Sequence, residues 1–237
     1  MKKVAIVQSN YIPWKGYFDQ IRNVDLFIFY DHVQYTKRDW RARNYIKTPK
    51  GKKWITIPCG SSIKRKIYEV SLSDHSWQQS HFDIIKRNYK AAKYYREYVP
   101  FFEEIYLSKT WHNLSEFNQY VVKRIAYEIM GVKTVFEDSR IYNVNSVKAE
   151  GIKEILNKCG AEIFLCGPSA KNYLNEDFLK TIKAEFVWMD YSGYSEYNQL
   201  YPPFDHQVSI LDLIFNEGPN TVKYMKTLLL ETSVPRM

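Results

Sequence analysis

Polar side chains stand at the ends of several predicted strands, where they could take part in chemistry. Gln8, Asp31 and Asp190 each end or follow an apolar run, and Gly167 and Ser169 follow another. In open parallel sheets, ligands bind at the carboxyl ends of the strands. We therefore expect these amide, carboxylate and small polar groups to meet in one substrate-binding crevice. The alternative is that Gln8 and Asp190 only cap helices or satisfy loop amides.

A basic segment follows Asp31 and carries groups suited to an anion. Lys37, Arg38, Arg41 and Arg43 lie within seven consecutive positions, and arginine presents a planar fork that matches phosphate oxygens. The same segment holds amide and aromatic side chains that can contact a base or a sugar: Gln34, Tyr35, Trp40 and Asn44. We expect it to bind a diphosphate. A solvent-exposed basic loop and nonspecific nucleic-acid binding are the alternatives, although no known nucleic-acid-binding motif accompanies the charge.

A histidine is the natural candidate for a general base, because imidazole titrates near neutral pH. None of the five histidines forms an HxH or HExxH pair, so we expect no metal. His81 lies in a helical pattern with Tyr89 two turns further on, and it is our candidate base. A structural histidine is the alternative. Cys166 could act as a nucleophile, but a free cysteine at a buried strand end is more often inert packing.

Alternating strand and helix patterns predict the fold. We expect strands at residues 3–8, 25–30, 54–57, 134–136, 162–166 and 185–189, and helices at 16–23, 77–95, 114–130, 146–159, 178–184, 209–215 and 220–229. Such alternation favours a parallel sheet with helical crossovers. We predict an α/β fold with an open, mostly parallel sheet flanked by helices and a helical insertion after the third strand. Residues 1–237 would form a single domain, with a mainly helical subdomain at about 77–130.

Composition and charge narrow the class of protein. A chain of 237 residues with 45% hydrophobic content can bury a substantial core. The net charge of +8 favours an anionic partner. The three cysteines form no CxxC pair, and the N-terminus enters a strand pattern without a secretory apolar core. We therefore expect a reduced cytoplasmic protein, not integrated in a membrane, because no apolar run approaches the roughly 20 residues of a spanning helix.

Several motifs together resemble the WbqC-like protein family. The most specific are YIPWKGYF at residues 11–18 and DHVQY at residues 31–35. The helix around His81, the turn FLCGPSA at residues 164–170 and the stretch at residues 204–219 extend the resemblance over almost the whole chain. Two positions depart from the pattern usual in the family. Ser9 follows Gln8 in place of proline, and Cys166 replaces the serine that precedes the Gly-Pro-Ser turn.

The resemblance implies a role in the biosynthesis of O-antigen or another bacterial surface polysaccharide. We expect an N-acyl- or aminoacyltransferase that modifies the amine of a nucleotide-linked amino-deoxy sugar, with glycine as one candidate group. The partners would be a nucleotide sugar or another phosphorylated small molecule, and a carrier of the acyl or aminoacyl donor. The basic segment would hold the diphosphate, and aromatic residues such as Tyr11 and Trp14 would face the sugar. Asp31 or His81 would accept the proton of the amine.

The sequence leaves a noncatalytic function open. The basic, aromatic surface could instead hold a carrier protein, a nucleic acid or a polysaccharide intermediate. Charge reversal at Lys37, Arg38 and Arg41 would then abolish binding, whereas changes at Asp31 and His81 would not. No cofactor can be assigned from the residues.

Overall fold

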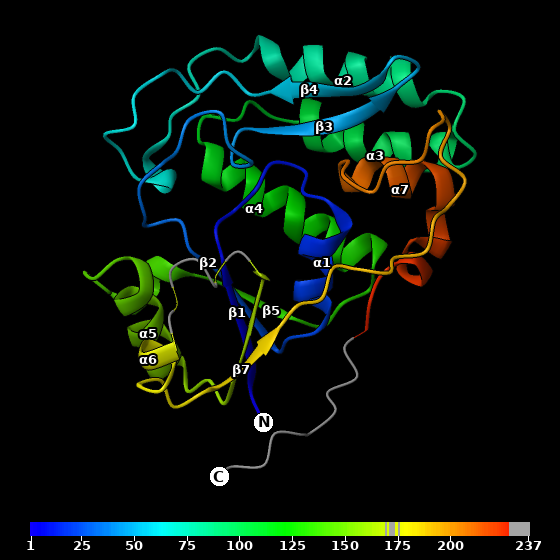
Figure 1. Ribbon diagram of the computed structural model, residues 1–237. Coiled ribbons are helices and arrows are strands. Elements are labelled where there is room, and N and C mark those ends of the chain that lie inside the picture. The colour runs from blue at the N-terminus through cyan, green and yellow to red at the C-terminus, as the bar shows by residue number, and fades with distance from the viewer. Residues whose placement is uncertain (169, 171–173, 175, 228–237) are drawn as a thin grey trace.

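Five short strands form a parallel sheet in the computed structural model, which describes residues 1–168, 170, 174 and 176–227. The strands lie in the order β5-β2-β1-β6-β7, and each neighbouring pair is parallel (Figure 1). Their bounds are β1 Lys3–Val7, β2 Leu26–Phe29, β5 Val135–Asp138, β6 Ile163–Cys166 and β7 Glu185–Trp188. The predicted α/β class with a mostly parallel sheet is confirmed.

Helices cover both faces of this sheet. The α-helices are α1 Lys15–Arg22, α2 Ser76–Tyr89, α3 Tyr95–Leu107, α4 Leu114–Arg124, α5 Lys148–Cys159, α6 Glu176–Leu179 and α7 Ile210–Glu217. Alternate strand residues face opposite layers, as the pleat of a strand requires. Ala5 and Phe27 pack with α1 and α4, whereas Val4 and Leu26 pack with α5. In Figure 1, α5 and α6 lie to the left of the sheet and α1 to its right.

The order of the strands creates a crevice beside the central strand. After β1 the chain adds β2 and β5 on one side, and it then crosses over to add β6 and β7 on the other. The loops that leave β1 and β6 therefore run to opposite faces of the sheet, the arrangement in which doubly wound folds bind their ligands. This switch point lies next to Gln8 and Gly167, the residues that follow the two strands.

A separate antiparallel hairpin stands above the sheet (Figure 1). Its strands are β3 Arg43–Thr48 and β4 Gly51–Thr56, and it packs against α2, where the Lys47 amide donates to the Tyr89 hydroxyl at 3.0 Å. The third strand expected at residues 54–57 thus belongs to this hairpin and not to the parallel sheet. Part of the basic segment, where we predicted no strand, forms β3.

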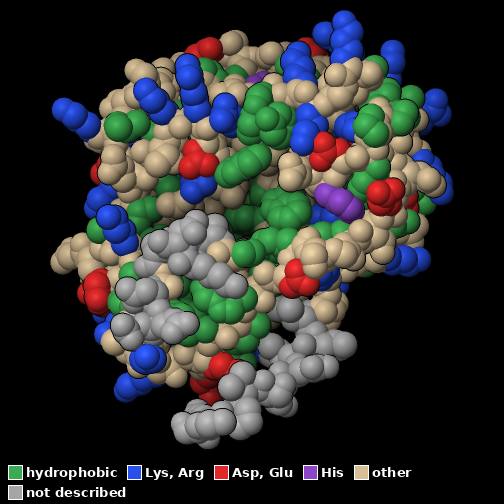
Figure 2. Space-filling view, in the orientation of Figure 1, with side chains coloured by type: hydrophobic (Ala, Val, Ile, Leu, Met, Phe, Trp, Pro, Cys, Tyr) green, Lys and Arg blue, Asp and Glu red, His purple; other side chains and the backbone are tan. Residues whose placement is uncertain are grey.

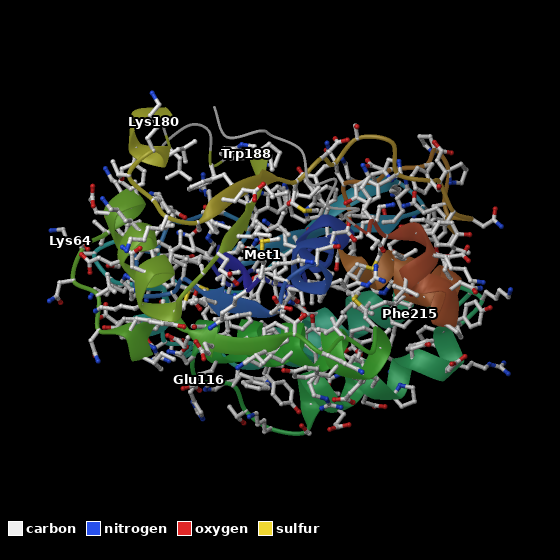
Figure 3. All side chains as sticks on the ribbon, turned by 90° about the horizontal axis from the view of Figure 1, so that it is seen from below. Met1, Lys64, Glu116, Lys180, Trp188 and Phe215 are labelled. Atoms are coloured by element: carbon white, nitrogen blue, oxygen red, sulfur yellow. The ribbon has the colours of Figure 1, made fainter. Side chains whose placement is uncertain are left out.

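Residues 77–130 hold most of α2 and all of α3 and α4, and this region shares its core with the sheet. Apolar side chains of α2, α3 and α4 join the same cluster as α1 and the strand residues that face it. Phe215 of α7, labelled in Figure 3, is fully buried in this cluster, whereas Lys180 lies exposed beyond α6. Shorter turns complete the path: a π-helix at Ile125–Ile129 and 3₁₀ segments at Ile67–Glu69, Ser139–Tyr142 and Gly218–Tyr224.

None of the helices in the described part of the chain has the length and apolar character needed to cross a membrane.

Candidate functional site

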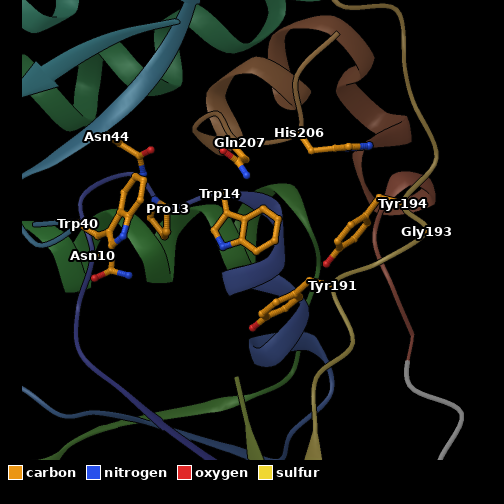
Figure 4. A pocket seen from close by; sticks show the side chains of 10 residues that line it. All are labelled: Asn10, Pro13, Trp14, Trp40, Asn44, Tyr191, Gly193, Tyr194, His206 and Gln207. Carbon is orange, nitrogen blue, oxygen red and sulfur yellow. The ribbon is translucent and has the colours of Figure 1, made fainter. Parts of the chain in front are cut away.

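A cavity of about 600 Å³ opens beyond the carboxyl ends of β1 and β7. Its size falls in the range of small-molecule sites. Figure 2 shows hydrophobic side chains gathered around a hollow on this face. Most of the Lys and Arg side chains on the same face lie further from the hollow (Figure 2). Four segments line the cavity (Figure 4): Asn10, Pro13 and Trp14; Trp40 and Asn44; Tyr191, Gly193 and Tyr194; His206 and Gln207.

Hydrogen bonds to the loop after β1 fix three of these segments to one another. The Tyr11 amide donates to the Trp40 carbonyl at 2.9 Å, and the Ile210 amide donates to the Pro13 carbonyl at 2.9 Å. The Asn44 side-chain amide donates to the carbonyls of Tyr11 and Ile12, each at 3.0 Å. The cavity wall is therefore held by backbone groups and a buried amide, which makes it a preformed site.

The wall combines aromatic rings with side-chain amides. The Trp14 ring meets Tyr191 at a centroid distance of 5.0 Å and Tyr194 at 5.9 Å, both edge to face. Asn10, Asn44 and Gln207 supply donors and acceptors around them. Rings with a polar handle suit the apolar face of a sugar or the plane of a base, and a few amides can fix its orientation.

Gly16 makes room for the Trp14 ring on the first turn of α1. A Cβ atom at Gly16 would lie 2.3 Å from the Trp14 Cζ2 atom, much closer than two carbons can approach. Only glycine therefore fits beneath this part of the cavity wall.

Gly16→Ala should lower the free energy of unfolding by about 1–2 kcal/mol, because the Trp14 ring must leave its position. In a helix, alanine is normally more stable than glycine by up to about 1 kcal/mol. The change in stability expected for Gly16→Ala therefore has the opposite sign to the one that helix preference alone would give. Urea denaturation measures the loss of stability, and tryptophan fluorescence detects the displacement of the Trp14 ring. Ser80→Ala, at an exposed position of α2, is the control. A more stable Gly16→Ala protein with unchanged fluorescence would contradict the packing argument.

Two cationic side chains lie beside the cavity. Arg41 donates to Gln8 Oε1 and, at 3.4 Å, to Oδ1 of Asn10, which lines the wall. Lys15 is buried, and its Nζ lies 4.4 Å from the ring centroid of Tyr194, another wall residue. Burial lowers the pKa of Lys15 to about 8, although the charge of Asp19 opposes the shift.

His206 and Asp19 both lie next to Tyr194. The carboxylate of Asp19 accepts a hydrogen bond from the Tyr194 hydroxyl and another, at 3.0 Å, from the Lys226 backbone amide. Burial raises the pKa of Asp19 to about 6. Burial and then the charge of Lys15 lower the pKa of His206, so its imidazole is neutral at pH 7 and can accept a proton.

The two bases predicted from the sequence lie in the protein interior and do not line the cavity. Asp31 is 0% exposed, because α4 covers the end of β2 and supplies the Ser115 hydroxyl and the Gln119 amide to its carboxylate. Burial raises the pKa of Asp31. His81 is 5% exposed, with Nδ1 2.7 Å from the Tyr11 hydroxyl, and burial lowers its pKa to about 4.

The structure brings some of the predicted binding residues together and separates others. Trp14, Trp40 and Asn44 line the cavity, Gln8 and Arg41 lie bonded beside it, and a Cβ at Gly167 would lie 3.4 Å from the hydroxyl of the wall residue Tyr191. Tyr11 and Tyr35 are buried, Gln34, Lys37 and Arg38 are exposed, and Ser169 lies outside the described residues. Asp190 is exposed and binds Ser192 and Lys226 rather than the cavity.

Several wall residues were missed from the sequence: Asn10, Pro13, Tyr191, Gly193, Tyr194, His206 and Gln207. Asn10 and Pro13 lie in the loop after β1, so their position at a strand end was a usable signal. Tyr191 and Tyr194 follow β7 in the same way. His206 precedes α7 and follows no sheet strand, so the rule of strand ends could not have found it. In the described part of the chain, no group of three His, Cys, Asp or Glu side chains is placed to hold a metal ion.

The fold and the cavity define an α/β protein with a cavity of small-molecule size beside the switch point of a parallel sheet. The chain belongs to the WbqC-like protein family, whose model matches residues 8–224. It is 41% identical over 228 residues to the uncharacterized protein Rv1507c of Mycobacterium tuberculosis, covering 95% of this chain and 98% of that protein. No solved structure matches the chain significantly.

Proposed function

We propose that the protein is a transferase of bacterial surface-polysaccharide biosynthesis that acylates or aminoacylates the amine of a nucleotide-linked amino-deoxy sugar. The observation that carries this proposal is the cavity at the switch point, with aromatic rings, amides and neighbouring cations. Membership in the WbqC-like family supports it, because resemblance to that family implies O-antigen biosynthesis. A sugar ring would contact Trp14 and Trp40, and amides such as Asn44 would bond its hydroxyl groups.

Amide formation requires a base next to the amine. The amine nitrogen attacks the carbonyl carbon of an activated ester or thioester donor, and a C–N bond forms as the bond to the leaving oxygen or sulfur breaks. The proton lost by the amine passes to the base and then to the leaving group. His206 fits this role, because its ring lines the cavity and its lowered pKa keeps it neutral.

Asp31 and His81 act in this proposal as positioning residues. Asp31 accepts the Ser9 amide at 2.8 Å and so fixes the turn that leads to Asn10. His81 holds the Tyr11 hydroxyl, and the backbone of Tyr11 joins the loop after β1 to Trp40. Both residues therefore act on the cavity through the loop that lines it.

Trp40→Ala should weaken binding of a nucleoside-diphosphate amino sugar about 10-fold, because a base or sugar loses one stacking surface. Calorimetric titration of a panel of such sugars measures the affinity, and mass spectrometry after addition of glycyl or acyl thioesters detects the amide. Tyr127→Ala is the matched control, because Tyr127 is 45% exposed and lies outside the cavity lining, whereas Trp40 is 43% exposed.

The results separate the two classes of function. The transferase is supported if the wild type forms the amide and if Trp40→Ala, but not Tyr127→Ala, loses affinity for the sugar nucleotide. Binding without product from any donor favours the noncatalytic binding protein instead. If no sugar nucleotide binds or is modified, the proposal fails.

A further inference from the structure

Two buried nitrogen atoms near Tyr194 have no hydrogen-bond partner among the described residues. They are Nζ of Lys15 and Nδ1 of His206. Lys15 Nζ lies 4.4 Å from the centroid of the Tyr194 ring, and the His206 ring centroid lies 6.0 Å from it. The Lys15 ammonium group and the His206 ring therefore both lie next to one ring of the cavity wall. Buried polar groups in native proteins are almost always bonded, so these two nitrogens are open to a partner that is not part of the chain, such as a ligand or a water molecule.

The charge of Lys15 strengthens this argument. Lys15 is 3% exposed, and a buried ammonium ion is unfavourable unless it is paired. Asp19, one helical turn further on, attracts it, but the Asp19 carboxylate is bonded to the Tyr194 hydroxyl and the Lys226 amide. The rings of Tyr194 and Tyr197, at 4.4 and 5.5 Å, offer cation–π contacts, which satisfy none of the three donors of the ammonium group.

Lys15 also stands at the first position of α1, a helix of eight residues. Its N-cap residue, Trp14, makes no side-chain cap bond, and the first turn contains no acidic residue. The positive end of the helix dipole thus adds to the charge of Lys15, and no carboxylate of the first turn offsets it. Trp14 itself lines the cavity, so this positive region begins at the cavity wall.

We propose that the cavity contains an anion subsite at the start of α1, in which Lys15 binds a phosphate or carboxylate group of the ligand and His206 contributes a second hydrogen bond. The flexible stem of Lys15 lets Nζ move past the edge of Tyr194 to the anion. The identity of the ligand rests on the proposed function. In that function the anion is the diphosphate of the sugar nucleotide or the carboxylate of a donor.

Lys15→Met tests the subsite in the full-length protein, because methionine retains most of the length and volume of the side chain without its charge. Calorimetry at pH 7 with inorganic pyrophosphate and, separately, sodium acetate should show that the wild type binds one of them. The variant should bind it at least about 10-fold more weakly. Lys90→Met removes the same charge from an exposed position beyond α2 and should change the affinity less than about twofold. Preference for pyrophosphate identifies a phosphate subsite, and preference for acetate a carboxylate subsite.

The pH dependence gives a second measurement that does not need the variant to fold. The titratable neighbours are Asp19, His206 and Lys226, whose Nζ lies 5.2 Å from the centroid of the Tyr194 ring. The hydroxyls of Tyr194 and Tyr197 stay protonated because burial raises their pKa values. Loss of the proton from Lys15 above pH 8 should weaken anion binding. Affinity that is unchanged from pH 7 to 10, no binding of either anion, or equal losses in Lys15→Met and Lys90→Met would overturn the subsite.

Failure of the subsite can be told apart from failure of the proposed function. If the wild type and Lys15→Met bind a sugar nucleotide equally well, the function stands and the subsite is wrong. If no sugar nucleotide binds but pyrophosphate or acetate binds in a Lys15-dependent way, the subsite stands and the proposed function is wrong.

Discussion

Asp31→Ala lowers the free energy of unfolding by about 3 kcal/mol at pH 7, the largest loss that we expect from replacing one polar residue. The Asp31 carboxylate is fully buried and accepts the Ser9 amide at 2.8 Å, the Gln119 amide at 3.1 Å and the Ser115 hydroxyl. Removing it leaves the Ser9 amide and the Ser115 hydroxyl in the core without this acceptor, whereas the part-buried Gln119 amide still donates to Asp138 Oδ2 at 2.8 Å. Each unsatisfied buried group costs about 1–3 kcal/mol, less whatever the donors recover by rearrangement.

Urea denaturation measures this loss, and Asp190→Ala is the control. Asp190 also follows a strand of the sheet, but it is exposed, so its replacement should change stability by less than about 1 kcal/mol. Comparing the two stability losses distinguishes a buried carboxylate that positions the loop, Asp31, from an exposed carboxylate that does not, Asp190. If Asp31→Ala were as stable as the wild type, the buried network would be wrong and Asp31 would return as a candidate base.

The parallel sheet could be predicted from the sequence because its strands carry a local signal. β2 and β6 are runs of four residues that are all buried, and such runs between helical patterns are typical of parallel strands covered on both faces. The rule that ligands lie at strand ends also led to Gln8, which is bonded beside the cavity, and to Asn44 in the segment that follows Asp31. These inferences needed only neighbouring residues and the period of their pattern.

The far wall of the cavity and the burial of Asp31 could not be predicted in this way. His206 reaches the cavity because the segment that precedes α7 is bonded to the loop after β1, through the Ile210 amide and the Pro13 carbonyl. Asp31 is covered because Ser115 and Gln119 of α4 pack over the end of β2. A strand-end rule gives the edge of the sheet where a side chain lies, but contacts between distant segments decide whether solvent reaches it.

The second large effect has the opposite sign. Lys15→Met should raise the free energy of unfolding by about 1–2 kcal/mol at pH 7 without ligand, because it removes a buried, unpaired ammonium group. Burial lowers the pKa of Lys15 from 10.5 to about 8. One pKa unit corresponds to about 1.4 kcal/mol, which sets an upper limit of about 3 kcal/mol. Loss of the cation–π contact with Tyr194 at 4.4 Å offsets part of the gain.

The pH dependence of this gain identifies its cause. Below pH 8 Lys15 is protonated in both states, so the folded protein carries the full penalty. Between pH 8 and 10.5 the unfolded chain keeps the proton that the folded protein has lost, and the stability of the wild type rises relative to the variant. Urea denaturation from pH 7 to 10.5 should therefore show the advantage of Lys15→Met shrinking across this interval, with no such trend for Lys90→Met. A constant difference, or a variant less stable than the wild type at pH 7, would mean that the ammonium group already has a partner in the folded protein, and the unpaired charge would no longer point to an anion.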